Sequence, residues 1–137
     1  MIDYLLDTGI LVRHLRNDPG YIALTGQLSS EGVLSIASFT RFEILRGMRD
    51  YEQERTCDLL DSMESFPMND QVADLAGELV RVWRKRGITL GEGDVIIAAT
   101  ALSQGLALVT TNARHFPMPE LTVWDTDKTG NLNIYQR

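Results

Sequence analysis

The sequence predicts an α/β protein in which a parallel sheet carries helices on both faces. Short apolar runs typical of buried strands alternate with longer segments of helical spacing, and that alternation is typical of parallel sheets. The 137 residues fit one domain, and a hydrophobic content of 44% is ordinary for a globular protein. We find no internal repeat, low-complexity tract or linker in the sequence. We therefore expect a single domain over residues 1–137.

Charge and cysteine content exclude several classes of protein. The 13 basic and 19 acidic residues give a net charge of -6, which argues against a protein that holds nucleic acid mainly through overall positive charge. Cys57 is the only cysteine, so an internal disulfide or a thiolate metal cluster is excluded. The N-terminal segment has acidic residues and no basic region, and no apolar run approaches the roughly 20 residues that span a bilayer. We expect a cytoplasmic protein without a signal peptide or membrane segment.

The first half of the chain begins with a predicted strand and a short helix. Residues 2–6 form an apolar run, broken only by Asp3, that indicates a buried strand. The helix over residues 10–15 stops before the Asp18-Pro19-Gly20 turn. The other elements expected in this half are helices over residues 21–28, 38–47 and 51–63, a strand over residues 33–36 and a weak edge strand over residues 65–68.

The second half contains the clearest helix of the chain. Asn69-Asp70 is expected to cap it, its apolar residues recur at i, i+3, i+4 and i+7, and Gly87 is expected to end it. Asp94 heads a second helix, nearly all apolar and therefore buried on most sides, which Gly105 closes. The remaining expected elements are a buried strand over residues 106–110, a loop over residues 112–119 and a last strand over residues 121–124, followed by a polar tail.

Asp7-Thr8-Gly9 follows the first predicted strand at the point where a helix begins. In open parallel sheets, ligands bind at the carboxyl ends of the strands. Asp7 therefore lies where chemistry is expected. Asp7 or Thr8 also suits a plain helix N-cap, and that interpretation needs no active site.

Two further carboxylates, Glu43 and Asp94, also lie at or just beyond the start of a predicted helix. If the strands are parallel, the three carboxylates meet at one edge of the sheet and raise one another's pKa values. A divalent cation relieves that repulsion, and all-oxygen ligands suit Mg²⁺ or Mn²⁺. Each residue has a structural alternative as well: Thr40 with Glu43 fits a capping box, and Asp94 fits an N-cap.

The last turn of the helix over residues 70–87 is strongly basic. Cations at that position complement the helix dipole, and they would also suit contacts with phosphate groups. The two roles are compatible. The residues are Arg81, Arg84, Lys85 and Arg86.

Four segments form a pattern that is similar to a known family. They are LLDTGIL at residues 5–11, SFTRFEILRG at 38–47, GDVIIAATA at 93–101 and LVTTNARHF at 108–116. Together they resemble the PIN-domain ribonucleases, in particular the VapC-type toxins of prokaryotic toxin–antitoxin pairs, and the resemblance covers residues 4–125. It implies a three-layer α/β/α fold whose five-stranded parallel sheet has the order 3-2-1-4-5. It also implies a Mg²⁺- or Mn²⁺-dependent endoribonuclease that is usually a homodimer and is silenced by an antitoxin protein.

The resemblance assigns roles to individual residues. Asp7, Glu43 and Asp94 match the acidic metal positions of the family, with Asp7 and Asp94 as direct ligands and Glu43 binding directly or through water. Thr8 matches a hydroxyl residue that supports the first acid, and Thr110 and Asn112 match a polar pair at the end of the fourth strand. The side chains of Thr8 and Asn112 would position the phosphate or orient the ligands.

The sequence departs from the family after the fourth strand. Family members often carry a further acid there, whereas residues 110–116 contain none. Asn112 and His115 occupy the corresponding positions, and Glu92 is a partial substitute. One bound metal and two bound metals are both compatible with this pattern.

The expected reaction is hydrolysis of an RNA phosphodiester bond. One alternative is another Mg²⁺-dependent phosphohydrolase, but the haloacid dehalogenase type needs an Asp two residues after the first acid, where this chain has Gly9. The other alternative is a weak or inactive PIN domain that only binds RNA or a protein partner. The missing fourth acid favours that alternative.

Overall fold

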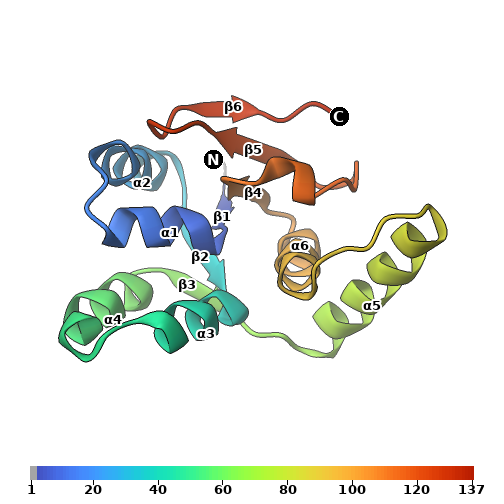
Figure 1. Ribbon diagram of the computed structural model, residues 1–137, viewed down its shortest axis with the longest axis horizontal. Coiled ribbons are helices and arrows are strands. Elements are labelled where there is room, and N and C mark those ends of the chain that lie inside the picture. Colours follow the sequence, from blue (N-terminus) through green and yellow to red (C-terminus); the bar gives the residue numbers. More distant parts are fainter. Residues whose placement is uncertain (1–2) are drawn as a thin grey trace.

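A six-stranded sheet with the order β3-β2-β1-β4-β5-β6 forms the centre of the computed structural model, which describes residues 3–137 (Figure 1). The first five strands along the chain pair in parallel, and β6 is antiparallel to β5. The predicted order 3-2-1-4-5 is confirmed, whereas Ile2 of the predicted first strand lies outside the described residues. The strands are β1 Tyr4–Leu6, β2 Leu34–Ala37, β3 Glu64–Phe66, β4 Ala107–Thr110, β5 Val123–Thr126 and β6 Leu132–Ile134.

The sixth strand is a feature that the sequence analysis missed, because residues 125–137 were expected to be a polar tail. A tight turn returns the chain so that Trp124 pairs with Ile134. In this turn the Asp127 carboxylate accepts hydrogen bonds from the backbone N–H groups of Thr129 and Asn131, both at 2.9 Å, and such bonds lower the pKa of Asp127 to about 2. Gly130 adopts a φ of 81°, which side chains disfavour.

The helices lie on both faces of the sheet, as predicted. Figure 1 shows α5 and α6 on one side and α1 to α4 on the other. The helices are α1 Thr8–Leu15, α2 Pro19–Glu31, α3 Ser38–Gly47, α4 Gln53–Asp61, α5 Asp70–Lys85 and α6 Glu92–Gln104, with short 3₁₀ turns η1 Asp50–Glu52 and η2 Ala113–His115. The predicted helix over 51–63 is therefore divided between η1 and α4, and the predicted loop over 112–119 contains η2.

Two hydrophobic cores cover the two faces of the sheet. Successive residues of β1 show the division, since Leu5 packs in the core with α5 and α6, whereas Tyr4 and Leu6 pack in the core with α1 to α4. All three side chains are buried. Because β1 lies inside the sheet and is covered on both faces, its carboxyl end is held rigidly, and a side chain that follows it has a fixed position.

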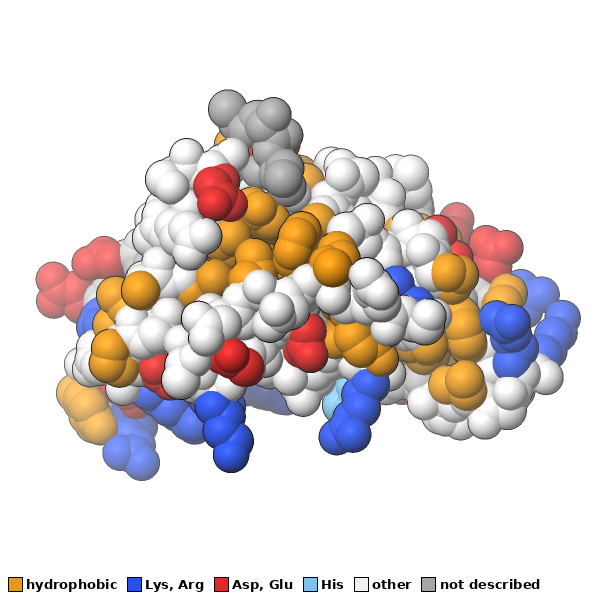
Figure 2. Space-filling model, turned by 90° about the horizontal axis from the view of Figure 1, so that it is seen from above, with side chains coloured by type: hydrophobic (Ala, Val, Ile, Leu, Met, Phe, Trp, Pro, Cys, Tyr) orange, Lys and Arg blue, Asp and Glu red, His pale blue; other side chains and the backbone are white. Residues whose placement is uncertain are grey.

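Charge is unevenly distributed over the surface. Figure 2 looks down on Figure 1 and shows Lys and Arg side chains projecting mainly from the lower edge and the right end of the view. The right end is formed by the end of α5. Basic groups are thus concentrated locally on a chain whose net charge is -6. Among residues 3–137, no helix combines the length and apolar character needed to cross a membrane.

Candidate active site

Asp7 is buried at the carboxyl end of the central strand. It directly follows β1, is 7% exposed, and its Oδ1 accepts a hydrogen bond from the Thr8 N–H at 2.8 Å. Its Oδ2 accepts a hydrogen bond from the Thr110 hydroxyl at 2.6 Å, from the end of the neighbouring strand β4. The N-cap interpretation of Asp7 is therefore correct. The N-cap role does not explain the second, buried hydrogen bond that Asp7 accepts from Thr110 on β4.

Glu43 reaches the same edge from α3. The Thr8 hydroxyl donates to Glu43 Oε1 at 2.6 Å and lies 3.3 Å from the Thr40 hydroxyl oxygen. Arg46, one turn further along α3, lies 3.8 Å from Glu43 Oε2. The predicted role of Thr8 needs correction: its hydroxyl binds Glu43, and only its backbone N–H binds Asp7.

The capping box predicted at Thr40 and Glu43 is wrong. The helix α3 begins at Ser38, directly after β2, with Ala37 at the N-cap and no side-chain cap bond. Glu43 therefore lies inside the helix rather than at its start. Its side chain points to the site because α3 begins at the carboxyl edge of the sheet.

Asp94 approaches from the first turn of α6. Its side chain is 32% exposed, and its Oδ2 lies 3.3 Å from His115 Nδ1. The N-cap interpretation of Asp94 is wrong, because α6 begins at Glu92 and Gly91 occupies the N-cap. Asp94 is thus free of a capping role.

A glycine allows α6 to come close to α3. A Cβ atom on Gly93 would lie 3.0 Å from the Phe39 ring and 3.7 Å from Glu43 Oε2. A side chain at this position would require the Phe39 ring to shift by a few tenths of an ångström. Gly93 therefore helps to bring Asp94 toward Glu43.

The three carboxylates are electrostatically coupled. Burial raises the pKa of Asp7, the hydrogen bonds from Thr110 and Thr8 lower it, and the negative charges of Asp94 and Glu43 raise it further. Burial also raises the pKa of Asp94, with His115 lowering it and Glu43 raising it. The site therefore carries negative charge that the surrounding protein does not fully compensate, which is the condition that a bound cation relieves.

The donors suit a hard divalent cation, since Mg²⁺ and Mn²⁺ prefer carboxylate oxygens. Among residues 3–137, no three His, Cys, Asp or Glu side chains are already arranged to hold a metal ion. The orientations seen here serve the hydrogen bonds to Thr8 and Thr110 and the contact with His115. The chemistry of the set fits a cation, and the side chains would have to turn toward it.

Of the residues considered for the fourth position, His115 is the one that contacts a site carboxylate. Asn112 is exposed: its side chain contacts the Thr111 hydroxyl at 3.3 Å, and its backbone N–H donates to the Thr110 hydroxyl oxygen at 3.0 Å. Asn112 thus acts on Asp7 only indirectly, through Thr110. Glu92 is exposed in the first turn of α6. The short turn η2, which the sequence did not reveal, directs His115 to Asp94.

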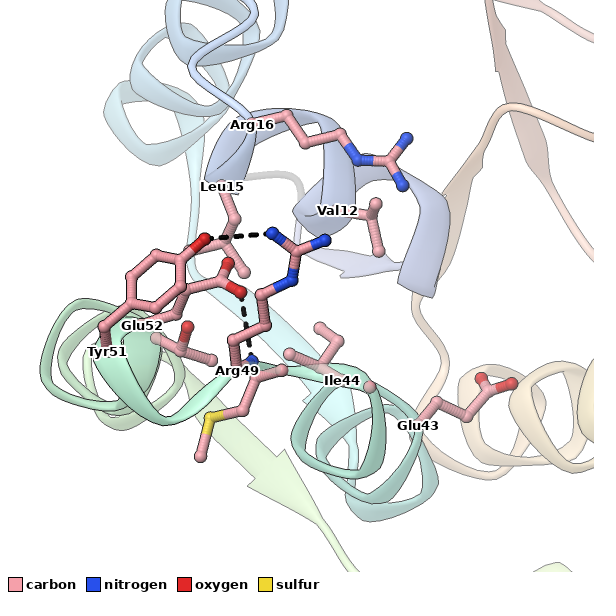
Figure 3. Close-up of a pocket in the computed structure, with 11 residues that line it drawn as sticks. Val12, Leu15, Arg16, Glu43, Ile44, Arg49, Tyr51 and Glu52 are labelled. Carbon is pink, nitrogen blue, oxygen red and sulfur yellow. Dashed lines mark hydrogen bonds between the residues drawn. The ribbon is translucent and has the colours of Figure 1, made fainter.

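Cavities lie on both sides of the carboxylates. One, of 430 Å³, is formed by α1, α3 and η1 and has Glu43 at one end (Figure 3). Another, of 390 Å³, lies beside Asp94 and is lined by Arg114, His115 and the chain leading into α6. Two of the three carboxylates, Glu43 and Asp94, thus each open onto a cavity.

The basic turn at the end of α5 lies elsewhere. Figure 1 shows this end of the helix at the right margin of the molecule, far from α1 and α3. Arg81, Arg84, Lys85 and Arg86 are all exposed, and the Arg86 guanidinium stacks 4.7 Å from the centre of the Trp83 ring. The structure does not bring these four residues to the carboxylates.

The fold and the site together define a three-layer α/β/α protein with an acidic centre at the carboxyl edge of a parallel sheet. Comparison with known families places residues 4–119 in the PIN domain. The chain belongs to the PIN-domain family, as the sequence motifs indicated.

Several relatives share most of the chain. Ribonuclease VapC10 of Mycobacterium tuberculosis is 38% identical over 119 residues, which cover 85% of this chain and 87% of that protein. Ribonuclease VapC19 of the same organism is 34% identical and covers 85% and 95% of the two chains. Ribonuclease VapC1 of Haemophilus influenzae is 31% identical and covers 82% and 89%.

Solved structures show the same fold. VapBC2 from Rickettsia felis, bound to a DNA fragment from its promoter, has a TM-score of 0.81 at 25% identity and covers 92% of this chain and 100% of that one. VapBC-1 from nontypeable Haemophilus influenzae has a TM-score of 0.77 at 26% identity and covers 90% and 98%. The VapC-type resemblance of the sequence is thus confirmed.

Proposed function

We infer that this protein is an endoribonuclease, the toxin component of a toxin–antitoxin pair. Its membership of the PIN-domain family and its identity of 31–38% to proteins named ribonucleases support this function. The observation that carries it is Asp7, a buried carboxylate at the end of β1 whose pKa is raised by burial and by the charges of Asp94 and Glu43. A buried, uncompensated acidic centre on an edge where substrates bind is expected in a catalytic site.

The proposed activity depends on Mg²⁺ or Mn²⁺. Asp7 and Asp94 would be the direct ligands, and Glu43 would bind directly or through water. Held by these residues, a divalent ion would supply activation of water and stabilisation of negative charge on the phosphate and the leaving oxygen.

The surrounding hydrogen bonds orient the ligands. The Thr110 hydroxyl and the Thr8 N–H fix the two oxygens of Asp7, and the Thr8 hydroxyl holds one oxygen of Glu43. The other oxygen of Glu43, Oε2, lies 3.8 Å from Arg46 and would orient the attacking water. Asn112 positions Thr110 through its backbone N–H, and its exposed side chain would contact the phosphate.

The proposed partners are an RNA substrate, an antitoxin protein and a second copy of this chain. The similarity to VapBC2 from Rickettsia felis and VapBC-1 from Haemophilus influenzae supports the antitoxin, because VapC-type proteins are the toxins of toxin–antitoxin pairs. We place the protein in the cytoplasm, where its RNA substrate would be found. The basic turn Arg81, Arg84, Lys85 and Arg86 is at most an outer contact for RNA, because the end of α5 lies far from α1 and α3 (Figure 1).

Cleavage of total cellular RNA by the purified protein, with and without Mg²⁺ or Mn²⁺, tests the function. Mapping the new 5′ ends would also reveal the cleaved sequence. Asp7→Asn and Asp94→Asn should abolish cleavage, and Asp74→Asn, an exposed Asp on α5, is the matched control. Wild-type rates in either site variant would refute the site. No cleavage by the wild type with either ion would refute the activity.

The second candidate function is a PIN domain that binds RNA or protein without efficient cleavage. It is favoured by one observation, the absence of an acid in residues 110–116, where His115 contacts Asp94 instead. Binding of RNA without any metal-dependent new 5′ ends would support this candidate.

A further inference from the structure

The cavity that ends at Glu43 has an apolar floor and a basic rim. Val12 and Leu15 of α1 and Ile44 of α3 line its floor. Figure 3 shows Glu43 at one end and Tyr51 at the other, with Arg16 and Arg49 between them at the mouth. The cavity therefore leads from the acidic centre to a surface with two cations and an aromatic ring.

The two arginines at the mouth lack carboxylate partners. Within residues 3–137, neither Arg16 nor Arg49 forms an ion pair, whereas other arginines of α1 and α3, Arg13, Arg41 and Arg46, each have one. Figure 3 shows the Arg49 guanidinium reaching across the cavity toward α1, which carries Arg16. Glu43 and Glu52 also line the cavity, but among residues 3–137 neither carboxylate lies within ion-pair distance of these two guanidinium groups. Two neighbouring cations that are not paired with a carboxylate favour an anionic ligand.

The aromatic ring beside them is available to a ligand. Tyr51 is 80% exposed, and its hydroxyl accepts a hydrogen bond from Arg49 Nη1 at 3.1 Å. The carboxylate of Glu52 is bound to the Arg49 backbone N–H at 3.0 Å and not to its guanidinium. An open ring next to a guanidinium is the combination that single-stranded nucleic acid uses for base stacking and phosphate contact.

We propose that this cavity binds the nucleotide next to the scissile phosphate of a single-stranded RNA. Arg16 and Arg49 bind the phosphate of that nucleotide, Tyr51 stacks on its base, and the apolar floor contacts the sugar. The proposal rests on the proposed function, because the bound nucleotide would belong to an RNA chain that continues past Glu43 into the acidic centre. Phosphate and base together match the cations and the ring better than an extended peptide does.

Binding of a short fluorescein-labelled single-stranded RNA, measured by anisotropy in chelator, tests the two arginines without cleavage. Arg16→Ala/Arg49→Ala should weaken binding by on the order of tenfold per arginine. Losing two phosphate contacts should also reduce the slope of log affinity against log salt by about 1.4. The matched control is Arg84→Ala/Lys85→Ala, which removes the same charge from the end of α5 and should cause a much smaller loss.

Two substitutions of Tyr51 test the stacking. Tyr51→Ala should weaken binding roughly 5- to 150-fold, because a stacked base is lost. Tyr51→Phe keeps the ring and loses only the contact with Arg49, so it should bind nearly as well as the wild type. Because Tyr51, Arg16 and Arg49 are exposed, these variants should fold, and a thermal melt verifies it.

The outcomes separate this proposal from the activity itself. If the wild type binds RNA through these residues but leaves total RNA uncut, the cavity assignment stands and the ribonuclease function fails. If the double arginine variant binds RNA like the wild type, or no worse than Arg84→Ala/Lys85→Ala, the assignment is overturned whatever the cleavage result. A protein partner would then be the candidate ligand of the cavity. A wild-type protein that does not bind the RNA also overturns it.

Discussion

Replacing Thr110 by Val tests the hydrogen bond that holds the central carboxylate. Valine keeps the shape but removes the hydroxyl that donates to Asp7 Oδ2 at 2.6 Å. Thr110 is fully buried and Asp7 is 7% exposed, so water cannot readily replace the lost donor. A hydrogen bond to a charged group contributes about 1.5–3 kcal/mol, and we expect the free energy of unfolding to fall by about 2 kcal/mol when Asp7 is ionised.

The cost of Thr110→Val should depend on pH. The pKa of Asp7 is higher in the folded protein than its ordinary value of 3.8. The contribution of protonated Asp7 to the stability of the protein is therefore complete below pH 3.8, and it is lost as pH rises through the folded-state pKa. The Thr110 hydroxyl lowers that pKa, and removing it raises the pKa further. Thr110→Val should therefore cost more at pH 7 than near pH 3.8, because the lost hydroxyl stabilises the ionised form of Asp7 and the share of that form rises with pH.

Urea unfolding in chelator at the two pH values measures this difference. Thr110→Ser is the matched control, because it keeps the hydroxyl and loses a buried methyl group, at a cost of about 1 kcal/mol that does not depend on pH. An equal cost of Thr110→Val at both pH values would show that the hydroxyl does not stabilise ionised Asp7.

Three other predictions address the same site and the basic turn. Asp94→Asn should stabilise the metal-free protein at pH 7 by on the order of 1 kcal/mol after screening, because it removes a carboxylate whose pKa is raised by burial and by Glu43. A variant that is less stable than the wild type in a thermal melt with chelator would contradict this repulsion. Thr8→Val should slow RNA cleavage about tenfold or more by releasing Glu43, whereas Thr8→Ser should retain activity; equal rates for both variants would argue against this role. Arg84→Ala/Lys85→Ala should lower stability by roughly 0.3–1 kcal/mol per charge if these residues serve the dipole of α5, and a melt that does not move would exclude that role.

The sequence predicted the features that local patterns encode. An apolar run followed by Asp7-Thr8-Gly9 placed the first acid correctly, because β1 is buried on both faces and must end where the polar residues begin. The helix predicted over residues 38–47 is α3, but the capping roles of Glu43 and Asp94 were predicted wrongly. The helix α3 follows β2 without a loop, and Gly91 is the N-cap of α6, so no side-chain cap marks either start.

The remaining features depend on contacts that are distant in sequence. The Thr8 hydroxyl binds Glu43, 35 residues away, and the pairing exists only because the sheet brings α1 and α3 together. Arg16 and Arg49 share a cavity for the same reason. The strand β6 escaped prediction because its residues are largely exposed and show no buried face.

Equilibrium binding of Mn²⁺, followed by the loss of the free-ion signal in electron paramagnetic resonance, tests most directly whether the three carboxylates form one metal site. The wild type and Asp74→Asn should bind Mn²⁺ equally well. Asp7→Asn and Asp94→Asn should each weaken binding by at least about tenfold, with thermal melts showing that both remain folded. If the two site variants bind Mn²⁺ as tightly as the wild type, the carboxylates do not form the metal site proposed for this protein.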